Sequence, residues 1–222
     1  MQPIIFCDFD GTITKTDNIV TLMMHFVPEQ SEKIGGAIMA NTISFKDGVS
    51  AMFELLSTDQ KDEIIHYLLQ TAEIREGFTE FVQFAHTHAI PFYVVSGGVD
   101  FFIEPMLKKY GPFTGVYCNH ADFSGEQIKL SYPHTYDEEC EKFEVQGCGC
   151  CKPSVMRSVS QESQFKIVIG DSISDFEAAK QADLVLARDH LLNRCEELQI
   201  PCKPFETFND CINAVKELIE DQ

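Results

Sequence analysis

Short apolar runs, each too brief for a helix, recur along the chain and constrain its fold most. The five runs are "PIIFCDF" (3–9), "FYVVSGG" (92–98), "GVYCN" (115–119), "FKIVIGDS" (165–172) and "DLVLAR" (183–188). Stretches with helical spacing of apolar residues lie among them, at 77–89, 100–110, 174–182 and 208–220. Strands that are apolar on both faces and alternate with helices are typical of a parallel sheet covered on both sides. We therefore predict an α/β fold with a doubly wound parallel sheet.

Residues 19–75 interrupt this alternation, because they contain helix-like stretches and no convincing strand. The stretches are "IVTLMMHFV" (19–27), "SEKIGGAIMA" (31–40), "DGVSAMFELL" (47–56) and "QKDEIIHYLLQTA" (60–72). A segment of this size can form a small helical bundle inserted after the first strand. We predict an α/β core domain made of residues 1–16 and 76–222, and a helical cap domain at 17–75. Residues 119–151 are the other irregular stretch, with many turn residues.

Three of the predicted strands end in reactive side chains. Asp8 and Asp10 end the first, Ser96 ends the second, and Asp171 lies at the end of another, with Asp175 just beyond it. The carboxyl ends of parallel strands meet at one edge of a sheet, so these groups should converge. If the first strand continues far enough, its period of two also points Asp8 and Asp10 the same way. Crowded carboxylates raise one another's pKa, and a hard divalent cation such as Mg²⁺ relieves the repulsion.

An anion could bind beside such a cation. The Ser96–Gly97–Gly98 turn offers a hydroxyl and exposed backbone N–H groups, which suit a tetrahedral anion. Lys152 follows "GCGCC" and precedes a proline, so a turn could aim its ammonium at the same place. Each signal is weak alone, because Ser-Gly-Gly turns commonly connect a strand to a helix and most single lysines are surface residues. The order of these signals along the chain makes them informative when they are taken together.

The motifs, taken together, resemble a known group. "DFDGT" (8–12), "SGG" (96–98), Lys152 and "GDSISD" (170–175) resemble, in order, the four motifs of the haloacid dehalogenase superfamily. A helical insertion between the first two motifs is similar to the cap of its phosphoserine-phosphatase-like branch. The resemblance covers essentially the whole chain, and it implies a Rossmann-like core with a helical cap.

The resemblance also implies an activity and the residues that perform it. It implies a phosphatase in which Asp8 is the nucleophile that becomes an aspartyl phosphate, and Asp10 is the general acid and base. Ser96, Gly97 and Lys152 would bind the phosphoryl group. The substrate would be a small phosphorylated metabolite, because a cap favours small substrates.

The same resemblance implies a magnesium cofactor. The Asp8 carboxylate, the backbone carbonyl of Asp10 and Asp171 would bind Mg²⁺, and Asp175 would orient the water molecules of the metal. These four residues form the predicted metal site.

The charge balance bears on partners. The chain has 17 Lys and Arg against 35 Asp and Glu, a formal charge of -18, and no basic run. Such a chain is repelled by nucleic acid and by anionic membranes, so we expect neither as a partner. The amino terminus lacks the basic region of a signal peptide, and no stretch reaches the length of a membrane span. We expect a cytoplasmic protein, either a monomer or a homodimer.

The cysteines leave alternatives open. Cys148, Cys150 and Cys151 include one C-x-x-C pair, and Cys140 lies nearby, among 9 cysteines in all. A structural zinc site usually needs two such pairs, or one pair with suitably spaced histidines. Bound zinc, a redox-active disulfide and free thiols all remain compatible with this pattern.

Three rival functions follow from the same residues. A phospho-receiver module also uses clustered aspartates, a lysine and magnesium, but it needs its phospho-acceptor alone on a middle strand, where this chain has Ser96. A zinc-binding interaction protein could be built on the cysteines. A phosphatase of the same branch acting on phosphoserine or another small phosphomonoester would share the chemistry and the fold.

Overall fold

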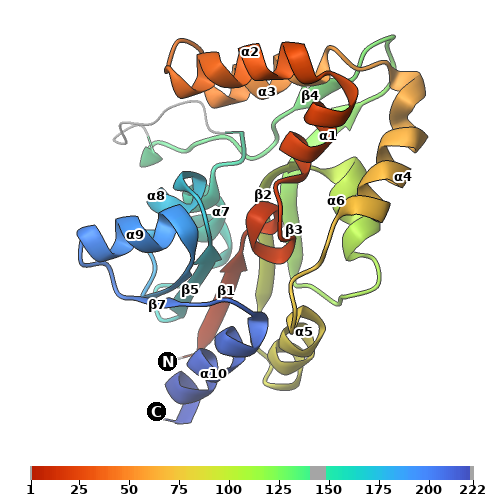
Figure 1. Ribbon diagram of the computed structural model, residues 1–222. Coiled ribbons are helices and arrows are strands. Elements are labelled where there is room, and N and C mark those ends of the chain that lie inside the picture. The colour runs from red at the N-terminus through yellow and green to blue at the C-terminus, as the bar shows by residue number, and fades with distance from the viewer. Residues whose placement is uncertain (1, 141–148, 221–222) are drawn as a thin grey trace.

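The computed structural model describes residues 2–140 and 149–220, which form an α/β fold with one seven-stranded sheet (Figure 1). The strands are β1 (Pro3–Cys7), β2 (Phe92–Val99), β3 (Gly115–Asp122), β4 (Lys129–Ser131), β5 (Phe165–Gly170), β6 (Leu184–Ala187) and β7 (Cys202–Pro204). Their order across the sheet is β4-β3-β2-β1-β5-β6-β7, and every pair is parallel except β3–β4. The predicted parallel sheet is confirmed.

The central strand β1 shows why this sheet is covered on both faces. Ile5 and Cys7 pack into one hydrophobic core, whereas Ile4 and Phe6 pack into a second core on the opposite face. The strand period of two therefore places apolar side chains in both cores. The strand ends at Cys7, so the expectation that strand alternation aligns Asp8 with Asp10 is wrong.

Helices cover the two faces. One core contains buried residues of α5 (Phe78–Thr87), α6 (Asp100–Leu107) and α10 (Phe208–Glu220). The other contains residues of α7 (Lys152–Val159), α8 (Phe176–Ala179) and α9 (Asp189–Glu197). These helices lie on opposite sides of the sheet in Figure 1. The edge strands β4 and β7 were not predicted, because each is only three residues long and lacks an apolar run.

The predicted helical insertion contains α1 (Asn18–Phe26), α2 (Pro28–Met39), α3 (Phe45–Phe53) and α4 (Lys61–Thr71). Figure 1 shows these helices above the carboxyl ends of the strands. A short antiparallel bridge, Thr14 with Ile74, joins the two chain segments that lead into and out of the insertion. The division into a core domain and a cap domain stays a prediction.

The residues that flank β4 also support the insertion. Tyr132 lies 2.6 Å from the Ser50 hydroxyl and donates a hydrogen bond to the Lys46 carbonyl. The backbone N–H of Ile128 donates to the carbonyl of Leu56. Part of the irregular stretch predicted at 119–151 therefore holds the α3 region over the sheet.

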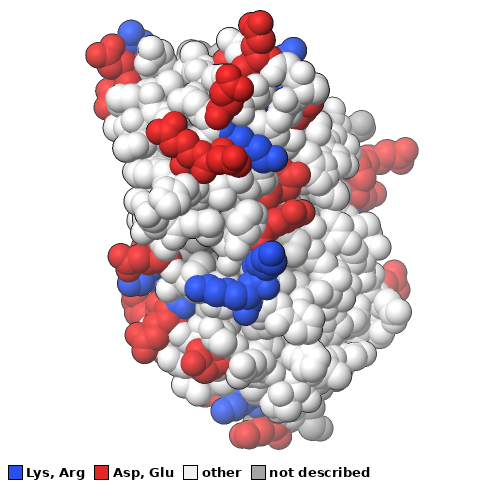
Figure 2. All heavy atoms as spheres, turned by 90° about the vertical axis from the view of Figure 1, so that its right-hand side faces the viewer, with Lys and Arg blue, Asp and Glu red and all other residues white. Residues whose placement is uncertain are grey.

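Most charged residues of the chain are acidic. On the face that Figure 2 presents, Asp and Glu side chains are spread from top to bottom, while Lys and Arg gather in small groups. With a formal charge of -18, the surface field repels anions, so an anionic ligand needs cations placed locally. Among the described residues, no helix combines the length and the hydrophobicity needed to cross a membrane.

Candidate active site

A tight turn follows β1 and carries the first motif. The Asp8 carboxylate accepts a hydrogen bond from the backbone N–H of Phe9 at 2.8 Å and so begins the turn Phe9–Ile13. Gly11 lies in the turn with φ of 80°, a left-handed conformation that favours glycine. A Cβ atom there would also come 2.4 Å from Asp171 Oδ2. Glycine is therefore required where the first and last motifs meet.

Lys152 connects two of the predicted carboxylates. Its Nζ lies 2.8 Å from Asp8 Oδ1 and 2.5 Å from Asp175 Oδ1, and all three side chains are buried. Burial alone would lower the pKa of Lys152, but Asp175 and Asp8 raise it above its usual value. The other Asp175 oxygen accepts the backbone N–H groups of Asp171 and Ser172. The lysine is therefore a fixed cation at the carboxyl end of the sheet.

Asp171 completes a cluster of three carboxylates, in which two oxygens have no hydrogen-bond donor among the described residues. One carboxylate oxygen from each of Asp8, Asp171 and Asp175 lies within 4.8 Å of the other two. Asp171 Oδ1 accepts a hydrogen bond from the Thr12 hydroxyl at 2.8 Å. Within the described part of the chain, Oδ2 of Asp8 and Oδ2 of Asp171 accept no hydrogen bond. These two oxygens are open to a ligand.

The electrostatics of the cluster fit a hard divalent cation. Burial, with the charge of Asp175, raises the pKa of Asp171 to about 6. Burial and the neighbouring carboxylate of Asp175 also raise the pKa of Asp8, although Lys152 opposes them. One lysine is too little charge for three carboxylates, and oxygen ligands of this kind are those that Mg²⁺ prefers. The structure thus shows a site that could bind a metal ion.

The second aspartate of the motif has a separate environment. Asp10 Oδ1 accepts hydrogen bonds from the Asn18 side chain at 2.7 Å and the Asn18 backbone N–H at 3.0 Å. Its Oδ2 lies 3.3 Å from the Ser96 hydroxyl. Burial and the nearby charge of Asp17 raise the pKa of Asp10 to about 7. The carboxyl group can therefore donate or accept a proton near neutral pH.

The end of β2 lies against Asp10. Ser96, Gly97 and Gly98 lie within β2, which continues to Val99, so the predicted turn at these residues is wrong. Ser96 Oγ accepts the backbone N–H of Gly98 at 2.9 Å, and Asn119 donates to the carbonyl of Gly97 at 2.7 Å. A Cβ on Gly98 would come 2.5 Å from Asp10 Oδ2, so a larger residue would displace that carboxylate. A Cβ on Gly97 would lie 4.0 Å from the ring of Phe45, a half-exposed residue of α3.

The structure brings the predicted catalytic, phosphate-binding and metal residues to one edge of the sheet, and their roles remain predictions. It also adds two hydrogen bonds that were not predicted. Thr12 holds Asp171, and Asn18 holds Asp10. The only sequence signal for Thr12 was its place in "DFDGT", and Arg75, which contacts the same turn, carried no signal.

The cysteine region is described only in part, since Cys148 lies outside the described residues. Cys140 Sγ lies 3.2 Å from Cys151 Sγ, and Cys150 Sγ lies 4.0 Å from the Tyr117 carbonyl. In residues 2–140 and 149–220, the three aspartates form the only cluster of three potential metal ligands. The zinc, disulfide and thiol interpretations therefore remain open for Cys148 and its neighbours.

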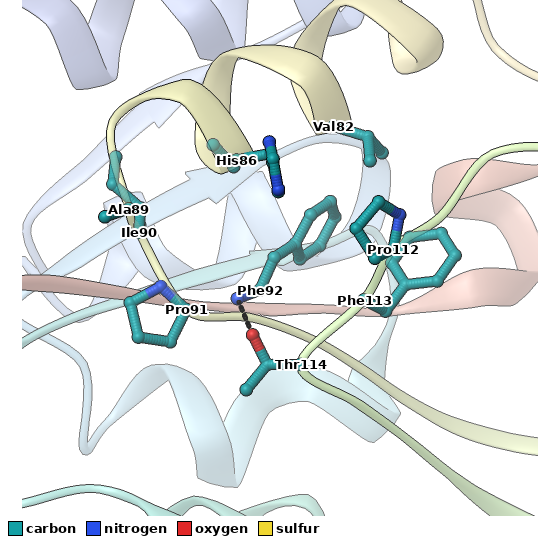
Figure 3. A pocket seen from close by; sticks show the side chains of 10 residues that line it. Val82, His86, Ala89, Ile90, Pro91, Phe92, Pro112, Phe113 and Thr114 are labelled. Atoms are coloured by element: carbon teal, nitrogen blue, oxygen red, sulfur yellow. Dashed lines mark hydrogen bonds between the residues drawn. The ribbon is translucent and has the colours of Figure 1, made fainter.

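An apolar cavity of about 280 Å³ lies at the opposite edge of the sheet (Figure 3). Val82 and His86 extend toward it from α5, Phe92 lies at the start of β2, and Pro112 and Phe113 come from a loop. His86 is the only titratable side chain among its lining residues, and no carboxylate or lysine reaches it. The cavity lacks the groups needed to bind a phosphate or a metal ion.

Comparison with known proteins agrees with this geometry. Residues 5–180 match the sequence model of haloacid dehalogenase-like hydrolases. The chain belongs to the haloacid dehalogenase-like hydrolase family. A family member from Lysinibacillus sphaericus, named 2-hydroxy-3-keto-5-methylthiopentenyl-1-phosphate phosphatase, is 71% identical over 99% of this chain and 96% of its own length. A protein of the same name from Bacillus cereus is 48% identical over 97% of both chains.

Solved structures of phosphoserine phosphatases have a similar fold. A phosphoserine phosphatase, solved as an analogue of its phospho-aspartyl intermediate, superposes with a TM-score of 0.70 at 16% identity and covers 96% of this chain and 98% of its own. A probable phosphoserine phosphatase from Vibrio cholerae has a TM-score of 0.73 at 15% identity, over 100% of this chain and 67% of its own. At such low identity, this similarity shows the fold alone.

Proposed function

We propose that this hydrolase is a magnesium-dependent phosphatase that removes the phosphate of 2-hydroxy-3-keto-5-methylthiopentenyl-1-phosphate and yields 1,2-dihydroxy-3-keto-5-methylthiopentene in methionine salvage. One observation carries the proposal: two adjacent aspartates lie in different environments. Asp8 lies beside Lys152 and the carboxylate cluster, whereas Asp10 is bonded to Asn18 and has a pKa raised to about 7. A nucleophile and a proton carrier need this division.

In the proposed reaction, the Asp8 carboxylate attacks phosphorus and forms an aspartyl phosphate. Asp10, protonated, gives its proton to the leaving enolic oxygen. The same Asp10, now ionised, takes a proton from the water that hydrolyses the acyl phosphate. Lys152 keeps Asp8 ionised and attracts the phosphoryl oxygens, while Ser96 and the Gly97 N–H bind them.

A magnesium ion would be held by Asp8, Asp171 and the backbone carbonyl of Asp10. Bound there, it neutralises charge on the phosphoryl oxygens. Asp175 has a different part, because Lys152 and two backbone N–H groups already use its oxygens. It would keep Lys152 in place and reach the metal through water molecules.

The substrate assignment rests on the close relatives and on one feature of the cap. The relatives at 71% and 48% identity, both named for this substrate, cover nearly the whole chain. Segments such as "YVVSGGVDFFIEP" and "GCGCCKP" also look like that phosphatase. Phe45 lies opposite Gly97, where an apolar methylthio chain would find a ring to pack against. We place the enzyme in the cytoplasm, acting on a small phosphorylated metabolite.

Phosphoserine is the second candidate substrate, favoured by the fold of the solved neighbours. Its ammonium and carboxylate groups need charged partners, whereas Phe45 offers none. A panel of small phosphomonoesters, including phosphoserine and the methylthiopentenyl phosphate, should be ranked by kcat/KM with Mg²⁺. We expect the methylthiopentenyl ester to rank first, and a preference for phosphoserine would refute the substrate assignment.

The nucleophile has its own test. We expect Asp8→Asn to abolish turnover and to yield no acid-stable phosphoenzyme, because an amide oxygen is a poor nucleophile. Its melting temperature should stay at or above that of the wild-type protein, since the substitution removes one of three crowded carboxylates. Substantial magnesium-dependent turnover by the folded variant would exclude Asp8 as the nucleophile.

A further inference from the structure

Arg75 is a buried cation without a carboxylate partner among the described residues. Its side chain is 6% exposed, and it lies between α4 and α5, on the segment that leads out of the helical insertion. Arginines are rarely buried unless they are paired. Its guanidinium instead donates to backbone carbonyls, at 2.8 Å from Nε to Thr12 O and 2.7 Å from Nη2 to Gly11 O. Burial of a charge that contacts backbone carbonyls and no carboxylate requires an explanation.

The carbonyls that Arg75 binds belong to the turn Phe9–Ile13, which follows β1. The backbone N–H of Arg75 also donates to Ile13 O at 2.8 Å, so this one residue binds three consecutive carbonyls. The turn cannot satisfy them as a regular helix would, because Asp10 has ψ of 122° and Gly11 has φ of 80°. Arg75 therefore supplies the donors that the irregular backbone leaves out.

The opposite side of the turn carries the reacting groups. Thr12, whose carbonyl binds Arg75, donates its hydroxyl to Asp171 at 2.8 Å. Asp10 immediately precedes Gly11, the other residue held by the guanidinium. A rotation of these peptide groups would therefore move both a metal ligand and the proton carrier.

We propose that Arg75 is a positioning residue, which holds the turn 10–13 so that Asp171 and Asp10 are aligned for metal binding and proton transfer. This inference rests on the proposed function. The hydrogen bonds of its guanidinium go to backbone carbonyls, so Arg75 would act through the turn. The guanidinium also lies 6.0 Å from the centre of the Phe205 ring, and its Nη1 lies 3.5 Å from the Glu206 carbonyl. The segment before α10 therefore packs against Arg75 as well.

The test compares metal affinity with stability. Arg75→Met keeps the length of the side chain and removes its donors, and Arg75→Lys keeps the charge without the fork that binds two carbonyls. Val215→Ala is the control, because Val215 is fully buried in α10, so its truncation lowers stability, and its apolar side chain donates no hydrogen bond to the turn. Binding of Mn²⁺ to each protein without substrate is measured by electron paramagnetic resonance, alongside melting temperature, kcat and KM.

We expect Arg75→Met to weaken Mn²⁺ binding and lower kcat by roughly ten- to a hundredfold each, with KM within about threefold of wild type. Arg75→Lys should fall between, and Val215→Ala should bind Mn²⁺ like wild type despite its lower melting temperature. If Arg75→Met does not fold, the Lys variant provides the same comparison. Wild-type affinity in the folded Arg75 variants would overturn the role of Arg75 alone. A wild-type protein that binds no Mn²⁺ would refute the metal site and this role together.

Discussion

Asn18 gives the sharpest test of the proton carrier, because it controls the pKa of Asp10. Its side chain and its backbone N–H both donate to Asp10 Oδ1, at 2.7 and 3.0 Å. Both bonds stabilise the ionised carboxylate and so lower its pKa, against burial and the charge of Asp17, which raise it to about 7. Asn18→Leu removes the side-chain donor and keeps the size of the residue.

The magnitude follows from the bonds. A hydrogen bond to a charged group contributes about 1.5–3 kcal/mol, and one pKa unit corresponds to about 1.4 kcal/mol. The backbone bond survives in the variant, so we expect the lower end of that range, a rise of about one pKa unit. The first step needs Asp10 protonated, so kcat/KM falls as the pH rises through its pKa. The alkaline limb should therefore move from about 7 in the wild type to about 8 in Asn18→Leu.

Asp17→Asn provides a comparison of opposite sign. It removes a like charge that raises the pKa of Asp10, so the alkaline limb should move to lower pH. An asparagine can still accept the backbone N–H of Val20 at the start of α1, so the helix keeps its cap. The assay is the pH dependence of kcat/KM with Mg²⁺, in which ionisation of the substrate is common to all three proteins. Alkaline limbs that coincide, or that move in the same direction, would refute Asp10 as the general acid.

Two further substitutions test the geometry around Asp10 and the cap. Gly98→Ala should lower kcat about a hundredfold, because its Cβ would meet Asp10 Oδ2. Gly36→Ala in α2 is the control: a Cβ there meets nothing within 4 Å, so this variant should keep kcat and have a slightly higher melting temperature. Equal kcat values for the two variants would contradict the predicted crowding of Asp10. Phe45→Ala should lower kcat/KM about tenfold for the methylthiopentenyl ester and leave kcat/KM for glycerol phosphate unchanged. An equal loss of kcat/KM for both esters would exclude a contact between Phe45 and the apolar chain of the substrate.

The sequence predicted the sheet because each central strand is an apolar run with distinct ends. It also predicted which groups meet, since Asp8 and Asp171 directly follow strands, Ser96 lies near the end of β2, and the carboxyl ends of these strands share an edge. The route by which Asp8 and Asp10 reach the site was wrong, because β1 ends at Cys7 and a turn takes over. The alternation of side chains along a strand, with its period of two, does not show at which residue the strand ends.

Arg75 could not have been predicted for a different reason. Its acceptors are backbone carbonyls, which every residue possesses, so neither partner has a side chain that marks the contact. The two are also separated by 63 and 64 positions in the chain, and only the pairing of Thr14 with Ile74 brings them together. Sequence motifs record groups that react, whereas the groups that hold a backbone in place leave no such pattern.

The turn after β1 explains how two aspartates separated by one residue could take the different roles proposed for them. A continued strand would point both carboxylates at the same neighbours, and a cation that ionised one would ionise the other. The turn instead directs Asp8 to Lys152 and the carboxylate cluster, and Asp10 to Asn18 and Ser96. A divalent cation bound beside Asp8 would therefore lower the pKa of Asp8 most, while burial and Asp17 raise the pKa of Asp10 to about 7. Two environments that hold the pKa values apart are what a nucleophile and a general acid require.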